Sequence, residues 1–439
     1  PGGAALHIYD SIFNQKEMQH ILVRHEQGAT HAADGYARAT GKPGVVLVTS
    51  GPGATNAITG IATAFMDSIP MVIISGQVQS HLIGTDAFQE TDMIGVSRPI
   101  VKHSFTVDKQ ENIANIVAEA FHIATSGRQG PVLIDVPKDL TNPVDLFDFV
   151  YPDKVHIRSY NPPTKPENHQ VSRAVDAILA SERPVIYAGG GTISSNASKE
   201  LRELNDLIDA PVTNTLMGLG VFPGTHKRFL GMLGMHGTYQ ANMAMHNADL
   251  IIALGARFDD RITNAPDKFA PRAKVIHFDV DHSSVSKIIE ADIAVFGQIK
   301  DSLQAINNHL KTKIDEIDND KLAPWHQQIS DWKEKHGLNH DLYKIEDDSG
   351  PILPQAAVQH IYQESKGKAF VTSDVGQHQM FAAQYYHFNE PRKWINSGGL
   401  GTMGFGLPAA MGVKLAYPDE EVICITGEGS IQMCIQELS

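Results

Sequence analysis

Short β-rich runs alternate with helical patterns through the first third of the chain, and this alternation restricts the fold more than any other feature of the sequence. The predicted strands and helices of this region cover residues 21–23, 45–48, 71–74 and 132–136 (strands) and 26–40, 54–66 and 111–125 (helices). A repeated strand–helix–strand order favours a parallel sheet with helices on both faces.

Two further blocks show the same order of elements. The predicted strands of these blocks cover residues 185–187, 250–254 and 275–278 in the second and 370–373 and 422–426 in the third. A proline-rich stretch at 141–168 is predicted as a linker, and a polar, charged stretch at 311–350 as a helical connector. Because 439 residues are too many for one core, we predict an α/β protein with three successive doubly wound parallel-sheet domains. The predicted boundaries are 1–145, 165–310 and 350–439.

Composition excludes several classes of function. The net charge is −14 and no run of Lys and Arg is present, so we expect neither nucleic-acid binding nor membrane binding. No apolar run reaches transmembrane length. The two cysteines, Cys424 and Cys434, form no disulfide framework and fit a reducing, cytoplasmic location. Because Pro1 is not a natural start and Ser439 lies inside a predicted helix, we expect both ends of a longer protein to be missing.

One carboxylate stands at a position typical of functional residues. Glu26 follows the apolar run Ile21–Val23 and opens an alanine-rich helical segment. At a strand-to-helix corner this side chain would face the carboxyl end of a parallel sheet, where α/β proteins bind ligands. The alternative is an ordinary acid in a first helical turn, favoured by the helix dipole. The local spacing leaves both interpretations open.

The chain also carries a set of motifs that belong together. They are Pro1–Ala4, Arg24–Gln27, Ala32–Arg38, Thr49–Asn56, Gly84–Glu90, Asp135–Asp139, Ser373–Met380, Ser397–Pro408 and Thr426–Ser430. Together they resemble the catalytic large subunits of the acetohydroxyacid synthase (acetolactate synthase) family, most closely the bacterial ones, over essentially the whole chain. The resemblance implies a thiamine-diphosphate-dependent transferase of valine, leucine and isoleucine biosynthesis. Such an enzyme decarboxylates pyruvate and condenses the hydroxyethyl unit with a second 2-ketoacid, pyruvate or 2-oxobutyrate.

The same resemblance implies the residues that hold thiamine diphosphate, with the first domain on its pyrimidine side and the third on its diphosphate side. Glu26 matches the glutamate that hydrogen-bonds ring nitrogen N1′ and promotes the imino tautomer of the cofactor. The family uses it across a subunit interface, so a homodimer or homotetramer is implied, together with a small regulatory subunit. The matching cofactor contacts are Gly376, Gln377, His378, Gly401, Met403, Gly429 and Ser430. Glu428 matches the first Mg²⁺ ligand, usually Asp in the family, and its extra methylene changes the geometry offered to the metal.

The middle block matches the FAD-contacting segments of the family. The matching residues are Arg128 from the first domain and Gly189, Gly190, Gly191, Thr215, Leu216, Met217, Leu233, Gly234, Met235, His236, Gly255, Ala256, Arg257, Asp259, Arg261, Asp279 and Val280. Arg257 and Arg261 are expected at the flavin diphosphate and Asp279 at the adenosine end. The alternative is a set of ordinary turns in a domain without ligand.

Substrate residues follow from the same family match. Gly3, Phe88, Gln89 and Lys138 correspond to the mouth of the cofactor pocket. Gln89 and Lys138 are expected to hydrogen-bond a 2-ketoacid carboxylate, and Phe88 to form an apolar wall. Taken alone, Lys138 would be an ordinary surface lysine.

The sequence contains features that other interpretations would use. Residues 399–404 satisfy the G-x-G-x-x-G pattern, but the sequence of residues 392–397 does not predict the first strand of a dinucleotide-binding unit, so we reject that assignment. The alternative enzyme is an FAD-dependent pyruvate oxidase of the same architecture, which product analysis without oxygen would distinguish. The alternative outside catalysis is an inactive fragment that only folds or assembles.

Overall fold

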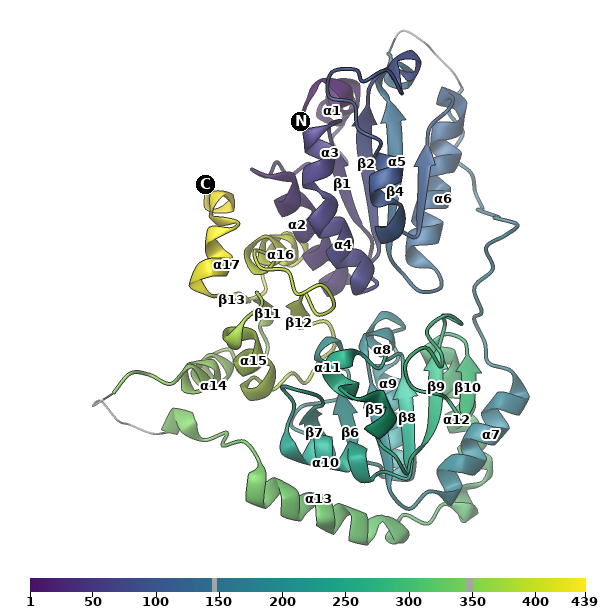
Figure 1. Ribbon diagram of the computed structural model, residues 1–439, viewed down its shortest axis with the longest axis vertical. Coiled ribbons are helices and arrows are strands. Elements are labelled where there is room, and N and C mark those ends of the chain that lie inside the picture. Colours follow the sequence, from purple (N-terminus) through teal and green to yellow (C-terminus); the bar gives the residue numbers. More distant parts are fainter. Residues whose placement is uncertain (144–147, 345–349) are drawn as a thin grey trace. The chain divides into compact units, whose positions relative to one another are not determined.

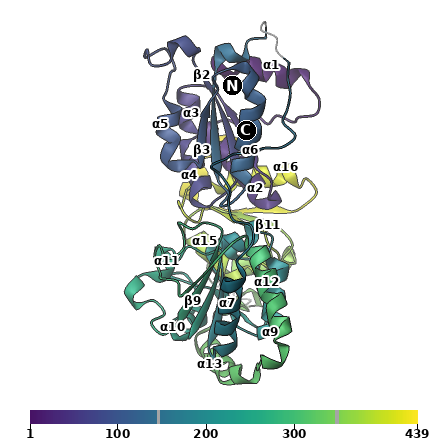
Figure 2. The same ribbon diagram turned by 90° about the vertical axis from the view of Figure 1, so that its right-hand side faces the viewer.

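The computed structural model describes residues 1–143, 148–344 and 350–439, which divide into two compact units. The first unit contains residues 1–161, 371–375 and 395–439, and the second contains 162–370 and 376–394. Both units are layered α/β structures (Figures 1 and 2). Among the described residues, no helix is both long and apolar enough to span a bilayer.

The first unit is built around a four-stranded parallel sheet. Its order is β1 (Gly44–Val48), β2 (Met71–Gln77), β4 (Pro131–Pro137) and β3 (His103–Thr106). All seven residues of both β2 and β4 except Ile74 are buried, as expected for central strands covered on both faces. One face packs against α2 (Glu26–Thr40) and α4 (Ile58–Met66), and the other against α6 (Ile113–Thr125).

Shorter helices complete the region around this sheet. They are α1 (Leu6–Asn14), α3 (Pro52–Asn56) and α5 (Met93–Ser97), with 3₁₀ turns η1 (Gly3–Ala5) and η5 (Lys138–Thr141). The predicted helix at 54–66 is interrupted at Ala57 and forms α3 and α4 instead.

A three-stranded sheet has the order β12 (Trp394–Asn396), β11 (Phe370–Ser373) and β13 (Val422–Ile425). The helix α16 (Gly406–Ala416) precedes β13, and α17 (Glu428–Gln432) and η11 (Ile435–Leu438) follow it. Helix α16 packs closely on α2 through two glycines. A Cβ on Gly412 would lie 1.9 Å from Ala32 O, and one on Gly35 would lie 2.3 Å from Ala409 O.

The second unit has a six-stranded parallel sheet in which strands are first added on one side of β5 (Pro184–Ala188) and then on the other. Its order is β10 (Ile293–Phe296), β9 (Lys274–Asp279), β8 (Leu250–Leu254), β5, β6 (Val212–Asn214) and β7 (Phe229–Met232). From β5 the chain builds outward to β7 and then crosses to β8 on the other side of β5. The boundary between β5 and β8 is therefore a topological switch point, where such sheets bind ligands.

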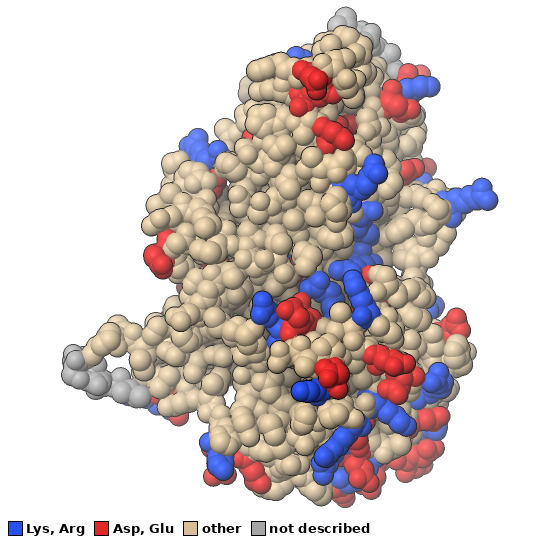
Figure 3. Space-filling model, viewed as in Figure 1, with Lys and Arg blue, Asp and Glu red and all other residues tan. Residues whose placement is uncertain are grey.

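Helices cover both faces of this sheet. One face carries α7 (Asn168–Ala180), α9 (Ser198–Ile208) and α12 (Ile299–Thr312), and the other carries α10 (Tyr239–Asn247) and α13 (Ala323–His336). The remaining helices of the unit are α8 (Gly190–Ser194), α11 (Asp260–Thr263), α14 (Pro354–Glu364) and α15 (Gln377–Tyr385). On the face shown in Figure 3, acidic and basic side chains are interspersed over this unit.

The predicted fold class is confirmed, and most predicted strands match within two residues. The predicted strand at Ile21–Val23 is wrong, because these residues pair with no strand and the side chains of Ile21 and Leu22 are 40% and 57% exposed. Glu26 consequently follows an irregular segment, and the strand-to-helix corner predicted there is wrong as well.

The segments between the predicted blocks agree with the sequence where they are described. The stretch 148–167 holds no helix or strand, and α13 lies within the predicted connector. Residues 345–349 of that connector and the predicted boundary at 145 lie outside the described residues. The three domain boundaries remain predictions.

Candidate active site

Glu26 is the first residue of α2, and one of its two carboxylate oxygens is bound by a neighbouring side chain. The preceding His25 caps the helix, with Nδ1 accepting from Gln27 N at 3.1 Å. Asn56 Nδ2 donates to Glu26 Oε2 at 3.0 Å. A Cβ on Gly53 would lie 3.2 Å from Oε1, so glycine keeps the space beside this oxygen open. Burial and the charge of Glu26 together raise the pKa of Tyr9. The half-buried carboxylate therefore has one oxygen oriented by the protein and one accessible to a ligand.

The backbone that leads into Glu26 is fixed by a second carboxylate, which sequence reasoning missed. Glu437 in η11 is 7% exposed and accepts from Arg24 N and His25 N, both at 3.0 Å. A Cβ on Gly28 would lie 2.7 Å from Glu437 Oε1. The partners are more than 400 positions apart, so no local pattern in the sequence indicates this contact.

The loop at 397–404 carries two predicted pyrimidine contacts, Gly401 and Met403. Gly401 has φ 71°, in the left-handed region that glycine tolerates best. Thr402 is tied to α4 by a 2.7 Å hydrogen bond between its hydroxyl and that of Thr63. Met403 is 37% exposed, and its methyl carbon lies 3.3 Å from the position that a Cβ on Gly429 would take. The structure thus brings together the predicted residues Met403 and Gly429.

The predicted metal residue stands at the start of a helix. Glu428 is exposed and begins α17, whereas Ser430 is buried and its hydroxyl has no hydrogen-bond partner among the described residues. The turn before it is anchored by Asp374, whose carboxylate accepts from Thr426 Oγ1 at 2.6 Å and from Gly406 N at 2.9 Å. Across the described residues, no three His, Cys, Asp or Glu side chains are grouped to hold a metal ion.

The predicted diphosphate turn lies in the second unit. Gly376 precedes α15, and Gln377 is the first residue of that helix, where free backbone N–H groups favour an anion. A Cβ on Gly376 would lie 2.8 Å from the His378 ring. His378 Nε2 is buried without a partner among the described atoms. The three predicted residues therefore form one turn, and the Nε2 atom of its histidine is available to a ligand.

The predicted substrate residues Phe88 and Gln89 lie in a loop organised by Glu90. The Glu90 carboxylate accepts from Gly84 N and from Ala87 N, and these backbone donors hold the pKa of Glu90 below its usual value. Gln89 has φ 61°, and Phe88 is 89% exposed. Glu90 was not predicted to have this role.

The loops that follow β1, β2 and β4 gather at one edge of the sheet. The backbone of Gln89 lies against Gly51, where a Cβ would come within 2.8 Å of its carbonyl oxygen. Asp139, next to Lys138 in η5, accepts from Ser80 N at 2.8 Å. The carboxyl ends of these parallel strands therefore carry the loops of Gln89 and Lys138. Gly3, in η1, has no atom within 4 Å of a Cβ position.

A buried carboxyl group lies beneath this edge. Asp135 is 3% exposed and accepts from Ser75 Oγ at 2.6 Å and from Gln77 Nε2 at 3.0 Å. Burial raises the pKa of Asp135 to about 6, although both hydrogen bonds oppose the shift. Gln77 also donates to Thr91 O at 2.8 Å, which links the strands to the segment after Glu90.

The predicted flavin segments converge at the switch point of the six-stranded sheet. Gly191 N donates to Gly255 O at 3.0 Å, and a Cβ on Gly189 would lie 2.3 Å from the same oxygen. Met235 N donates to Arg261 O at 2.8 Å, so two further predicted segments are adjacent. The predicted residues Gly189, Gly191 and Gly255 thus lie together at the ends of β5 and β8.

Polar atoms without partners mark the same region. Thr215 Oγ1 and both side-chain atoms of Asn214 are buried without hydrogen bonds among the described residues. Buried polar groups are nearly always paired, so these atoms fit a polar ligand at the end of β6. Asn214 was not predicted. Arg257 lies 3.6 Å from Asp259 in a partly exposed ion pair. Arg128 belongs to the first unit, where its Nε donates to Ser68 Oγ at 2.9 Å.

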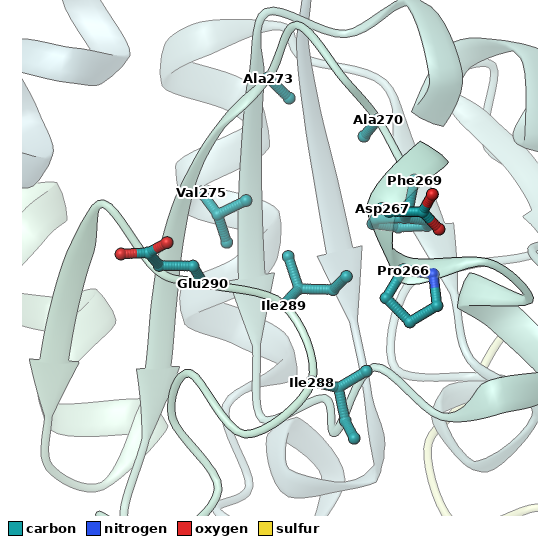
Figure 4. Close-up of a pocket in the computed structure, with 9 residues that line it drawn as sticks. All are labelled: Pro266, Asp267, Phe269, Ala270, Ala273, Val275, Ile288, Ile289 and Glu290. Carbon is teal, nitrogen blue, oxygen red and sulfur yellow. The ribbon is translucent and has the colours of Figure 1, made fainter.

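A separate cavity of about 340 Å³ lies in the second unit (Figure 4). Its walls come from the segment between α11 and β9, from Val275 of β9 and from residues 288–290. No predicted site residue lines it.

Three family models match successive parts of the chain. They are the thiamine pyrophosphate enzyme N-terminal TPP binding domain at 1–96, the central domain at 171–306 and the C-terminal TPP binding domain at 374–439. The fold and these matches define a thiamine-pyrophosphate-dependent enzyme.

Curated relatives specify the family further. The chain is 58% identical over 439 residues to the acetolactate synthase large subunit of Buchnera aphidicola subsp. Acyrthosiphon pisum. It is 55% identical to the acetolactate synthase isozyme 3 large subunit of Escherichia coli over 439 residues and to the large subunit of Haemophilus influenzae over 444. Each alignment covers 100% of this chain and 76% of the relative. The chain belongs to the acetolactate synthase large-subunit family.

Proposed function

We propose that this chain catalyses the acetolactate synthase reaction of branched-chain amino-acid biosynthesis with Glu26 as its acid–base residue. The reaction decarboxylates pyruvate and joins the remaining two-carbon unit to a second 2-ketoacid. The supporting observation is the Glu26 carboxylate, which is oriented by Asn56 on one oxygen and left open beside Gly53 on the other. With thiamine diphosphate bound, the Oε1 side of this carboxyl group would hydrogen-bond a ring nitrogen of the cofactor.

The chemistry that thiamine diphosphate supplies when bound is a nucleophilic carbon and an electron sink for decarboxylation. The residues present fit this group. His378 Nε2 and Ser430 Oγ are buried polar atoms that lack protein partners among the described residues. The N–H groups at the start of α15 suit a diphosphate, and the exposed face of Met403 suits an apolar ring.

The metal and the flavin belong to the same proposal. Glu428 would bind Mg²⁺ through its carboxylate, at the start of α17. FAD would lie at the switch point between β5 and β8, with Arg257 and Arg261 at its diphosphate and Asp279 at its adenosine. The buried Thr215 hydroxyl, which has no hydrogen-bond partner among the described residues, supports this placement.

Substrate and partners complete the proposal. Gln89 and Lys138 would hydrogen-bond the 2-ketoacid carboxylate, because both loops stand at the carboxyl edge of the same sheet. The names of the relatives describe a large subunit. We place the chain in a homodimer or homotetramer that associates with a small regulatory subunit.

The experiment compares wild type with Glu26→Gln and with the control Glu17→Gln, which alters an exposed side chain. Pyruvate turnover is measured without oxygen, acetolactate and acetate are quantified, and flavin absorbance is followed by stopped flow. Glu26→Gln should lose about 10²- to 10⁴-fold in turnover and keep its flavin, because an amide cannot exchange the proton. Turnover close to that of the control would refute the assignment of Glu26. Acetate with stoichiometric flavin bleaching would favour the pyruvate oxidase instead.

A further inference from the structure

A buried ion cluster in the first unit joins α2 to the end of α4. Arg38 binds both Asp34 and Asp67, with 2.8 Å between Arg38 Nη2 and Asp67 Oδ2. The side chains of both aspartates are fully buried, and that of Arg38 is 5% exposed. One guanidinium is thus shared by two carboxylates in a site that excludes water.

Asp67 also binds the loop that carries the predicted pyrimidine contacts. Gly398 N donates to Asp67 Oδ2 at 3.0 Å, and Gly399 N donates to Oδ1 at 2.7 Å. A Cβ on Gly399 would lie 3.0 Å from Asp67 Oδ1, so the loop backbone is pressed against the carboxylate. The loop reaches Gly401 and Met403 within the next four residues.

The same helix holds the loop at a second point. Thr63 lies one turn before Asp67 on α4, and its hydroxyl lies 2.7 Å from that of Thr402. Thr402 stands between Gly401 and Met403, and its own N–H donates to Ser397 Oγ at 2.9 Å. Asp67 and Thr63, both near the end of α4, therefore bind the loop at two separate points, Gly398–Gly399 and Thr402.

We propose that Asp67, supported by Arg38, is a positioning residue that sets the loop at 398–403 for binding the pyrimidine ring of thiamine diphosphate. Asp67 does not touch the cofactor and acts through the backbone of Gly398 and Gly399. The inference rests on the proposed function.

Electrostatics explains why an aspartate is suited to this position. A carboxylate that accepts backbone N–H groups in a water-excluded site makes charge-assisted hydrogen bonds, which are stronger than neutral ones. Burial raises the pKa of Asp34, whereas Asp67 receives the Arg38 guanidinium and the two N–H donors of the loop on its two oxygens. Loop and cluster therefore stabilise each other, and moving the loop away would leave a buried charge underpaired.

The test is Asp67→Asn, which keeps the size of the side chain and removes one acceptor oxygen and the charge. The matched control is Asp249→Asn. Asp249 also accepts backbone N–H groups, from Glu182 and Arg183 at 2.8 and 3.0 Å, but belongs to the second unit, whereas the loop belongs to the first. Thiamine diphosphate with Mg²⁺ is titrated into each protein by calorimetry, and turnover is measured against cofactor concentration.

Asp67→Asn should weaken cofactor binding roughly tenfold or more and recover much of its kcat at saturating cofactor, since only the loop is displaced. Asp249→Asn should bind the cofactor within about twofold of wild type. A lower unfolding temperature in both variants with unchanged cofactor affinity would show a purely structural role and overturn the proposal.

Thr63→Val keeps the inference testable if Asp67→Asn fails to fold. It replaces a hydroxyl by a methyl group of similar size and removes the bond to Thr402 together with the 2.9 Å bond to Thr59 O inside α4. Cofactor affinity should fall severalfold, and an affinity equal to wild type would contradict the role of α4. If wild type itself binds no thiamine diphosphate, the proposed function fails first, and this inference fails with it.

Discussion

The contact between α2 and α16 offers a direct test of whether helix packing in the first unit determines the positions of the candidate site residues. Gly412 sits where a Cβ would lie 1.9 Å from the carbonyl oxygen of Ala32. An ordinary contact begins at 3.4 Å, so Gly412→Ala requires a movement of about 1.5 Å. The atom in the way belongs to the helix backbone, so no side-chain rotation relieves the overlap.

Two opposing effects set the size of this change. Alanine favours a helix over glycine by about 1 kcal/mol. Overpacking a close contact costs about 1–3 kcal/mol, and a backbone obstacle places this case at the upper end. We expect a net loss of about 2 kcal/mol in the free energy of unfolding.

The effect on activity should exceed the effect on stability. Helix α2 begins at Glu26, and α16 follows the loop of Gly401 and Met403, so separating the helices displaces two segments that carry predicted site residues. A displacement of about 1 Å can reduce turnover about 10²-fold. Urea unfolding and pyruvate turnover are measured for Gly412→Ala and for Gly350→Ala, which has no atom within 4 Å of its Cβ position. The reasoning is refuted if both variants behave like wild type.

Two further predictions concern carboxylates of the first unit. Burial raises the pKa of Asp135 from 3.8 to about 6, so the folded state holds the proton more tightly, and the stabilisation is full below about pH 4 and lost as the pH rises through 6. Asp135→Asn should abolish this dependence, and its free energy of unfolding relative to wild type should improve by about 1 kcal/mol between pH 5 and pH 8 in urea titrations; a constant difference would contradict the buried acid. Glu90→Gln loses one acceptor for the backbone of Gly84 or Ala87, so the KM for pyruvate should rise while the unfolding temperature stays unchanged. An unchanged KM would show that this loop does not bind substrate.

Sequence patterns predicted the strands well wherever burial on both faces left a continuous apolar run. Residues 250–254 and 370–373 match β8 and β11 without any shift. The run Ile21–Val23 has the same composition but pairs with no other strand. A run of three apolar residues does not indicate whether a partner strand lies beside it, because strand pairing depends on the whole fold.

The sequence indicates candidate site residues where they fall in contiguous motifs, and their roles remain predictions. Glycine turns and their neighbours, such as Gly401 and Met403, could be located from family resemblance, and the structure places Met403 beside Gly429. The residues that hold these motifs in place could not be found this way. Asp67 meets Gly399 across 332 positions, and Glu437 meets His25 across 412.

These supporting residues bind the backbone through the same pattern of hydrogen bonds. Asp67, Glu90 and Glu437 each accept two backbone N–H groups, and each does so at a segment that carries predicted cofactor or substrate residues. A carboxylate has two acceptor oxygens that can bind two N–H groups at once, so a single side chain can fix both the position and the direction of a loop. Some of the acidic side chains that make the net charge negative therefore bind backbone N–H groups of the same chain. Replacing such an acid by its amide removes one acceptor while keeping the packing, which makes amide variants more informative than alanine variants for separating positioning from stability.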